Sequence, residues 1–327
     1  MLKYLLVVLG EDATSFCHYE AGARPKAGRG LIALDHLEAA VTFALKHNLK
    51  VNFLYPARPL AKAYEAVIDE VEHVKIVPFT ARLRHPEAIL VIEGDAFPSA
   101  DELRALRGAN VILRLRRAEL PKLAASVSRL LPRAKRVNLV LADLESFGPA
   151  EFEAYARELG KVRAKYLKLA PGKPRPELNV LTDRLVLDKM NNCDAGLTHL
   201  TVAPDGRLYL CPAFFYGGAD DSLGEIRNEI AVPNRRLLEL RYAPICRICD
   251  AYQCRRCIHL NRRLTLEVNT PSFQQCRVAH VEREASRLYL QTLGPAAGRV
   301  DIPEIPYSDP FEVVEKAKTT IAEFKKI

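Results

Sequence analysis

Seven of the eight cysteines of this 327-residue chain lie between Cys193 and Cys276, and this cluster restricts the fold more than any other feature. Disulfides are one use for cysteines, but they are rare in reducing compartments and are needed mainly where the core is small. Here 49% of the residues are hydrophobic, so a sizeable core can form without cross-links. The apolar run from Tyr4 to Leu9 is too short for a secretory signal. We therefore expect a cytoplasmic protein whose clustered thiols bind metal.

The spacing of these cysteines is typical of metal ligands. They are Cys193, Cys211, Cys246, Cys249, Cys254, Cys257 and Cys276. Four of them form two Cys-x2-Cys pairs, and each pair places two thiolates on one side of a turn, where both can reach one metal ion or cluster. Two zinc sites would need eight ligands and therefore a histidine, for which His199, His259 and His280 are nearby. Two 4Fe–4S clusters could share the thiolates as four plus three, because such a cluster tolerates one iron without a protein ligand. The spacing leaves both metals open.

The first half of the chain alternates short apolar segments with helical patterns. Six strands rich in Val, Ile and Leu are expected: Lys3–Leu9, Lys50–Leu54, His73–Val77, Ala88–Ile92, Asn110–Leu115 and Arg136–Leu141. Among the predicted helices, one has Asp35 as N-cap, one begins with a capping box of Ser99 and Glu102, and one runs from Glu151 and ends at Gly160. Six such units in series imply a parallel sheet, either an open partial barrel or a doubly wound sheet.

The pattern changes after residues 169–178, where three prolines indicate a linker. Thr198–Val202 and Arg207–Leu210 flank the sequence Pro204-Asp205-Gly206, which is typical of a hairpin. A helical spacing returns from Val278 to Leu290. Beyond it, a proline-rich strap and a closing helix are expected.

The run from Cys193 to Cys276 resembles the SPASM domain, the auxiliary-cluster module of radical S-adenosylmethionine enzymes that modify peptides. The match rests on Cys193, twelve residues, Gly206, four residues and Cys211, followed by a four-cysteine group and one late cysteine. The four-cysteine group is spaced x2, x4, x2 here, where the family usually has x2, x5, x3. The resemblance implies two 4Fe–4S clusters. One would be held by Cys246, Cys249, Cys254 and Cys276. The other would be held by Cys193, Cys211 and Cys257, with its fourth position open to a substrate group or closed by solvent, a side chain or a histidine.

Radical S-adenosylmethionine enzymes also have a partial barrel of six β/α units, but their reductive cluster needs Cys-x3-Cys-x2-Cys after the first strand. This sequence has Cys17-His18-Tyr19-Glu20 there and no other cysteine before Cys193. One thiolate cannot hold such a cluster, so no S-adenosylmethionine is expected in this chain, and Cys17 is interpreted as a single buried or loop thiol. Together with Val268-Asn269-Thr270-Pro271-Ser272, these residues resemble the Cys-x-x-x (CXXX) repeat peptide maturase family, here as a pseudo-radical S-adenosylmethionine protein.

The resemblance implies an α/β chain in four parts. These are a degenerate (β/α)6 partial barrel over residues 1–165, a linker over 166–182, a small SPASM-like α+β domain with two clusters over 183–292, and a strap with a C-terminal helix over 293–327. It further implies a catalytically incomplete subunit, paired with an active radical S-adenosylmethionine enzyme and with a ribosomally made precursor peptide of cysteine repeats. Such a subunit would bind the peptide, relay electrons, or both. A different function class stays open: a zinc-binding scaffold that recognises a peptide or docks a partner without a redox role.

The net charge and the remaining motifs say less about the function. Lysine and arginine outnumber acidic residues by 48 to 40, a net charge of +8 that permits an anionic partner but selects none. No apolar run reaches membrane length, and the aromatic and basic interleaving typical of nucleic-acid binding is absent. The basic segment Gly22–Gly30 and the pair Glu93 and Asp95 lie after strands, where parallel sheets bind ligands. Four arginines lie near the predicted ligands, where their charge would stabilise a reduced cluster: Arg207, Arg247, Arg255 and Arg256. No catalytic residue can be assigned.

Overall fold

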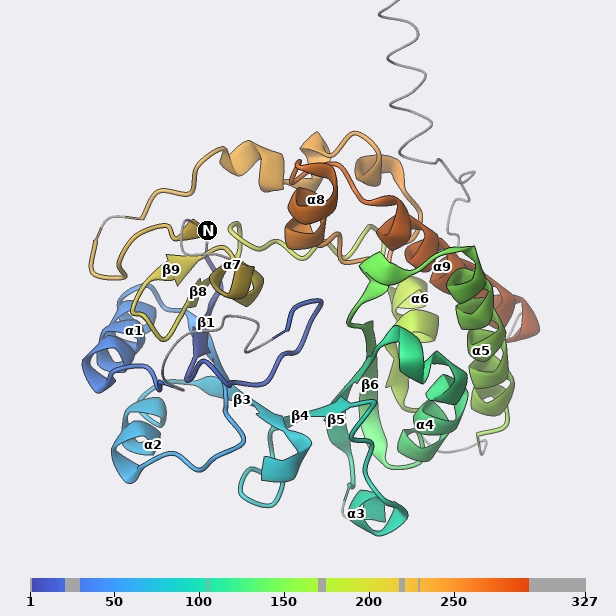
Figure 1. Ribbon diagram of the computed structural model, residues 1–327, viewed down its shortest axis with the longest axis horizontal. Helices are drawn as coiled ribbons and strands as arrows, with labels where there is room; N and C mark the ends of the chain where they lie inside the picture. The colour runs from blue at the N-terminus through green and yellow to red at the C-terminus, as the bar shows by residue number, and fades with distance from the viewer. Residues whose placement is uncertain are drawn as a thin grey trace, which may run out of the picture.

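A computed structural model describes residues 2–20, 30–104, 106–169, 175–217, 221–228 and 230–293. Its centre is one nine-stranded sheet with the order β7-β6-β5-β4-β3-β2-β1-β8-β9. Neighbouring strands are parallel except β8 and β9, which form an antiparallel hairpin. Figure 1 shows the sheet as an open arc that runs from β9 on one side to β6 on the other.

All six predicted strands are present, with ends within two residues of those expected. The strands are β1 (Tyr4–Val8), β2 (Lys50–Leu54), β3 (His73–Pro78), β4 (Ile89–Glu93), β5 (Ala109–Leu115), β6 (Ala134–Leu141), β7 (Glu177–Leu178), β8 (His199–Val202) and β9 (Leu208–Tyr209). The α/β class with a mostly parallel sheet is therefore confirmed. A doubly wound sheet would reverse its strand order at a switch point, whereas β1 to β6 follow one another in sequence across this sheet.

The helices lie mainly outside the arc. They are α1 (Leu34–Lys46), α2 (Lys62–Ile68), α3 (Ala100–Arg104), α4 (Leu123–Leu130), α5 (Pro149–Leu167), α6 (Arg184–Val186), α7 (Pro212–Gly217), α8 (Ile258–Thr265) and α9 (Phe273–Leu293). Figure 1 shows α1 to α5 on the outer side, while α7 and α8 face the opening. Helices on one side of a sequential parallel sheet are what right-handed crossovers produce. Among the described helices, none is long and apolar enough to cross a membrane.

Local signals located some helix ends and missed others. The capping box is confirmed, because the Ser99 N–H donates to the Glu102 carboxylate at 2.9 Å and the Glu102 N–H donates to Ser99 Oγ at 3.3 Å. The prediction for Asp35 was wrong: α1 begins at Leu34, so Asp35 lies in its first turn. The prediction for Gly160 was also wrong, since α5 continues through it to Leu167. The buried face of α5 outweighs the cost of one helical glycine, about 1 kcal/mol.

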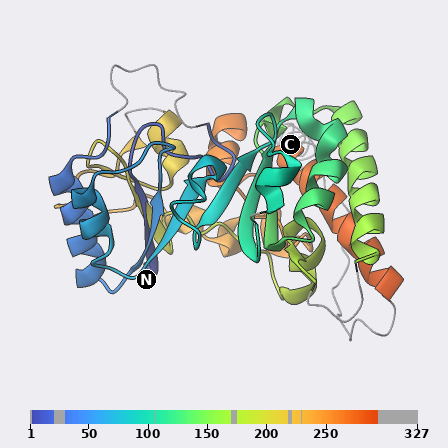
Figure 2. The same cartoon turned by 90° about the horizontal axis from the view of Figure 1, so that it is seen from below.

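The second half of the chain extends the sheet of the first half. Strand β8 pairs in parallel with β1, from Tyr4 opposite His199 to Val7 opposite Val202. The predicted hairpin is confirmed, and Gly206 supplies its turn with a φ of +77°, at a point where a Cβ would lie 2.4 Å from the His36 ring. Figure 2 shows α9 (orange-red) running beside α5 (green), and the two helices are in contact.

The four-part division of the chain stays a prediction. Three predicted segments lie wholly or mostly outside the described ranges. These are most of the basic segment 22–30, the proline-rich part of the linker at 170–174, and the strap and C-terminal helix at 294–327.

Candidate metal centres

Four of the predicted ligands surround one cavity of about 200 Å³. This second cysteine group consists of Cys246, Cys249, Cys254 and Cys276. Cys246 begins a 3-10 turn (Cys246–Ile248), and Cys276 lies in the first turn of α9. Cys246 is buried with Met190 and Ala243, and Cys249 and Cys254 pack against these residues. Segments separated in sequence therefore bring four thiols around a single space.

Backbone N–H groups point at the sulfur atoms of the second group. Ala251 N–H donates to Cys249 Sγ and Arg256 N–H donates to Cys254 Sγ, each at 3.5 Å. Burial raises the pKa of the Cys246 thiol to about 12 and also raises the pKa values of Cys249 and Cys254. These thiols are protonated at neutral pH while no metal is bound, so metal binding would have to release their protons. The N–H donors favour the thiolate form that ligation requires.

The first cysteine group consists of Cys193, Cys211 and Cys257, which are all free cysteines. Its members precede β8, follow β9 and precede α8. The Cys193 N–H donates to the carbonyl oxygen of Arg255 at 2.9 Å, which ties two of these segments together. Burial raises the pKa of Cys193 to about 11 and raises those of Cys211 and Cys257 as well. The pKa of Cys257 is raised further by Cys17, Cys211 and Cys193.

A fourth thiol, Cys17, lies with the first group. Cys17, Cys193 and Cys211 pack against the same buried cluster, which contains Leu6 and Val8 of β1. This neighbourhood could not be predicted from the sequence, because Cys17 belongs to the other half of the chain and to no cysteine motif. The parallel pairing of β1 with β8 brings this segment beside the cysteine-rich half.

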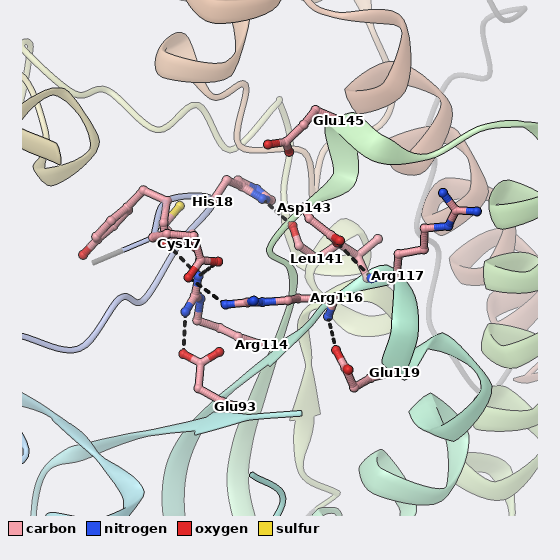
Figure 3. Close-up of polar contacts among 12 residues, drawn as sticks. Cys17, His18, Glu93, Arg114, Arg116, Arg117, Glu119, Leu141, Asp143 and Glu145 are labelled. Carbon is pink, nitrogen blue, oxygen red and sulfur yellow. Dashed lines mark hydrogen bonds and ion pairs between the residues drawn. The ribbon is translucent and has the colours of Figure 1, made fainter. Parts of the chain in front are cut away.

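A buried arginine fixes the segment around Cys17, here called the Cys17 loop (residues 15–20). Arg114 of β5 is 2% exposed. Its Nε donates to the carbonyl oxygen of Cys17 at 3.2 Å, and its Nη2 donates to that of Tyr19 at 2.7 Å. The guanidinium also forms ion pairs with Glu20, at 3.1 Å, and with Glu93 at the end of β4. Figure 3 shows Arg114 between Glu93 and the Cys17 loop. Glu93, which the sequence placed at the ligand edge, is thus an ion-pair partner within the chain.

The Cys17 loop has a second attachment at His18. Its Nδ1 donates to the carbonyl oxygen of Leu141 at 2.8 Å, at the end of β6 (Figure 3). Burial lowers the pKa of His18 to about 4, so the imidazole is neutral at pH 7. The loop is therefore held at two neighbouring strand ends, those of β5 and β6.

Of the four arginines near the predicted ligands, Arg207, Arg247 and Arg255 are exposed, whereas Arg256 is 1% exposed. Arg256 Nε donates to Asn192 at 2.8 Å and its Nη2 donates to the Leu238 carbonyl oxygen. Its Nη1 is buried and has no hydrogen-bond partner. Burial lowers the pKa of Arg256, and Cys246 and Asp194 are the groups that oppose this lowering most. Cys193 and Cys254 act in the same direction more weakly, so members of both cysteine groups interact with this guanidinium. An anionic thiolate-bound cluster would satisfy this orphaned donor, and the donor set therefore fits such a group.

The three histidines considered as ligands differ in position. His280 Nε2 lies 3.6 Å from Cys249 Sγ and lines the cavity of the second group. His199 instead stacks on Tyr4 with ring centroids 4.6 Å apart, and His259 packs edge-on against Phe214 at 5.4 Å. Within the described ranges, no three Cys, His, Asp or Glu side chains converge as ligands of one metal ion would.

Two further cavities adjoin the cysteine groups. A cavity of about 130 Å³ has Cys17 and Cys254 of the second group in its wall, and Glu282 also lines it. A larger groove of about 590 Å³ lies between the Cys17 loop and helices α7 and α8, and Phe214 and Leu266 are among its lining residues.

Solved structures similar to this chain share little sequence with it. No family model matches the chain, and no curated protein matches it either. Streptococcus suis SuiB bound to precursor peptide SuiA is similar at 9% identity and a TM-score of 0.37, over 75% of this chain and 66% of that chain, which is just under two thirds of its length. A further structure of Streptococcus suis SuiB has 10% identity and a TM-score of 0.35, over 84% and 74% of the two chains. BtrN in complex with AdoMet and 2-DOIA has 13% identity and a TM-score of 0.27, over 69% and 79%. The function proposed below rests on the residues of this chain.

Proposed function

We propose that this chain is a catalytically incomplete partner subunit of a radical S-adenosylmethionine peptide maturase, and that it binds two auxiliary 4Fe–4S clusters. The observation that supports this most is that the four predicted ligands of the second group line one cavity, while Cys193 and Cys211 of the first group pack on one buried cluster. In this proposal the β1–β6 sheet is a degenerate (β/α)6 partial barrel, residues 183–292 form the SPASM-like domain, and the protein acts in the cytoplasm.

The second cysteine group would hold one cluster, and Cys193, Cys211 and Cys257 would hold the other. Backbone donors to sulfur favour thiolate ligands in the second group, and the buried guanidinium of Arg256 interacts with members of both groups. When bound, such clusters supply one-electron transfer at potentials tuned by hydrogen bonds and burial. Zinc with Zn–S bonds of about 2.3 Å would instead need four sulfur atoms about 3.8 Å apart. The cavity lined by the second group, about 200 Å³, leaves room for a group larger than one zinc ion.

The Cys17 loop supports the incomplete character of the subunit. Where a reductive cluster would need three thiolates, this loop has one cysteine and is held by the ion pairs of Arg114 with Glu93 and Glu20. The charged groups at the carboxyl edge of β4 and β5 thus bond to one another. The radical that starts the chemistry would have to come from the partner subunit.

The groove beside the Cys17 loop is the proposed binding place of the precursor peptide. Leu266 lines it, is 86% exposed, and has a φ of +62°. A left-handed backbone costs a residue other than glycine about 1–2 kcal/mol. Leu266 is the left-handed C-cap of α8, and its exposed side chain offers a peptide an apolar contact at the groove. Arg262 and Arg263 on the same groove pair with Asp221 and Glu145, at 2.6 and 2.7 Å, and orient its rim.

One observation favours a second candidate function. The contact between His280 and Cys249 offers an imidazole beside thiolates, a ligand combination that zinc accepts. The chain would then be a zinc-binding scaffold for peptide recognition or docking, without a redox role.

The experiment that tests the proposal is co-purification of the chain with its genomic neighbours under anaerobic conditions. Iron, acid-labile sulfide and zinc are counted on the same sample, and S-adenosylmethionine cleavage is assayed with and without the partner. Two clusters predict about eight iron and eight sulfide per chain. Stoichiometric zinc without iron supports the scaffold instead. Cleavage of S-adenosylmethionine by the isolated chain would contradict an incomplete subunit.

A further inference from the structure

The first cysteine group supplies three thiols, and the fold places a fourth, Cys17, on the same buried cluster as two of them. After β1 the chain turns back over one face of the sheet, because Ala13 and Tyr19 belong to the same buried cluster as Leu6 and Val8. Cys17 lies in this returning segment and packs on that cluster together with Cys193 and Cys211. The thiol is thus directed toward the residues around β8 and β9 and is not left in an exposed loop.

Helix α7 links the segments that carry these thiols. It begins directly after Cys211, and its Tyr216 ring stacks on Tyr19 of the Cys17 loop, with centroids 5.5 Å apart and planes 14° from parallel. On the other side, Phe214 of α7 packs against His259, which lies two residues after Cys257. The Cys17 loop and the start of α8 are therefore held against the same short helix.

A backbone hydrogen bond brings the segment of Cys257 to the same place. The Cys193 N–H donates to the carbonyl oxygen of Arg255 at 2.9 Å, two residues before Cys257. Cys193, which packs on the same buried cluster as Cys17, is therefore tied to the segment that carries the third thiol.

We propose that Cys17 is the fourth thiolate ligand of the first cluster. The inference rests on the proposed function, which supplies that cluster. It assigns the ligand at the fourth position of the first cluster, which the spacing of the cysteines left open. The first cluster is then fully ligated by the chain and has no iron open to a substrate thiolate or amide. Its role is electron relay or cross-linking, and the peptide is bound elsewhere. The cluster also joins the two halves of the chain through covalent iron–sulfur bonds.

The test compares anaerobically prepared wild-type chain with Cys17→Ser. An iron without a cysteine ligand is lost readily on mild oxidation, so ferricyanide converts an incompletely ligated 4Fe–4S cluster to a 3Fe–4S cluster with its own electron paramagnetic resonance signal. We expect little of this signal from the wild type and up to one equivalent per chain from Cys17→Ser. Cys17→Asp, which keeps an anionic ligand, should give an intermediate amount. Phe16→Leu is the matched control in the same loop, because it keeps all eight thiols, and it should behave as wild type.

Iron counting keeps the test decisive if Cys17→Ser incorporates the first cluster poorly. Loss of one cluster, from about eight to about four iron atoms per chain, in Cys17→Ser but not in Phe16→Leu supports the same role. One equivalent of the three-iron signal in wild type and Cys17→Ser alike would overturn the inference and leave the proposed function intact. A wild-type chain without iron would overturn the proposed function, and this inference with it.

Discussion

Replacing Arg114 by methionine tests how the Cys17 loop is held. Methionine keeps most of the apolar stem and removes the charge and every donor. The carbonyl oxygens of Cys17 and Tyr19 lose their donor, and Glu93 loses its ion-pair partner. Breaking a buried ion pair costs about 3–5 kcal/mol. Since Glu93 is 34% exposed and can be partly rehydrated, we expect the lower end, about 3 kcal/mol of unfolding free energy.

Arg116 provides a matched control. It lies two residues further along the chain and pairs with the same Glu20, at 2.9 Å, but it is 47% exposed. An exposed ion pair contributes under about 1 kcal/mol, so Arg116→Met should be nearly neutral. Both variants are compared with wild type by urea denaturation of the metal-free, reduced chain, and the iron content of reconstituted samples is measured in parallel. Equal effects of the two substitutions, or a loss below about 1 kcal/mol for Arg114→Met, would refute the reasoning.

Three further substitutions have expected outcomes. Arg256→Gln removes the buried cation that faces the thiols and should make the potential of the second cluster more negative in a redox titration, whereas the exposed Arg255→Gln should not. Burial raises the pKa of the Glu282 carboxyl from 4.5 to about 7. The contribution of this group to the unfolding free energy is therefore present below pH 4.5 and is lost as the pH rises through 7. Glu282→Gln should remove this fall from unfolding free energies measured across that pH range. Leu266→Gly relieves a left-handed residue and should raise the unfolding free energy by about 1 kcal/mol while weakening precursor-peptide binding in a fluorescence titration; unchanged binding would exclude the groove.

The strands could be predicted from the sequence because their signal is local. Lys50–Leu54 was located to the residue, since an apolar run between turn signals has few alternatives. Helix ends depended on tertiary contacts. Gly160 reads as a stop until the buried face of α5, with Leu159 and Val162, is seen to continue beyond it. Packing against the rest of the fold therefore decides where α5 ends, and no short segment of the sequence holds that information.

The candidate site was predictable in part for a similar reason. The second cysteine group comes mostly from one stretch of the chain, so its spacing already indicated that Cys246 and Cys249 act together. The position of Cys17 depends on which strand lies next to β1, and strand order is a property of the whole sheet. The role of Arg114 was hidden as well, because an arginine within an apolar strand gives no sign of the carbonyl groups it will reach.

The pairing of β1 with β8 has a practical consequence for dissecting the molecule. A fragment that stops before β8 would leave β1 as an edge strand, with a row of unused peptide groups and the apolar side chains of Leu6 and Val8 uncovered. Such a fragment would tend to aggregate when expressed. The cysteine-rich half, expressed alone, would lack β1, the strand with which β8 of its hairpin pairs. The chain is best studied whole, with point substitutions in place of truncations.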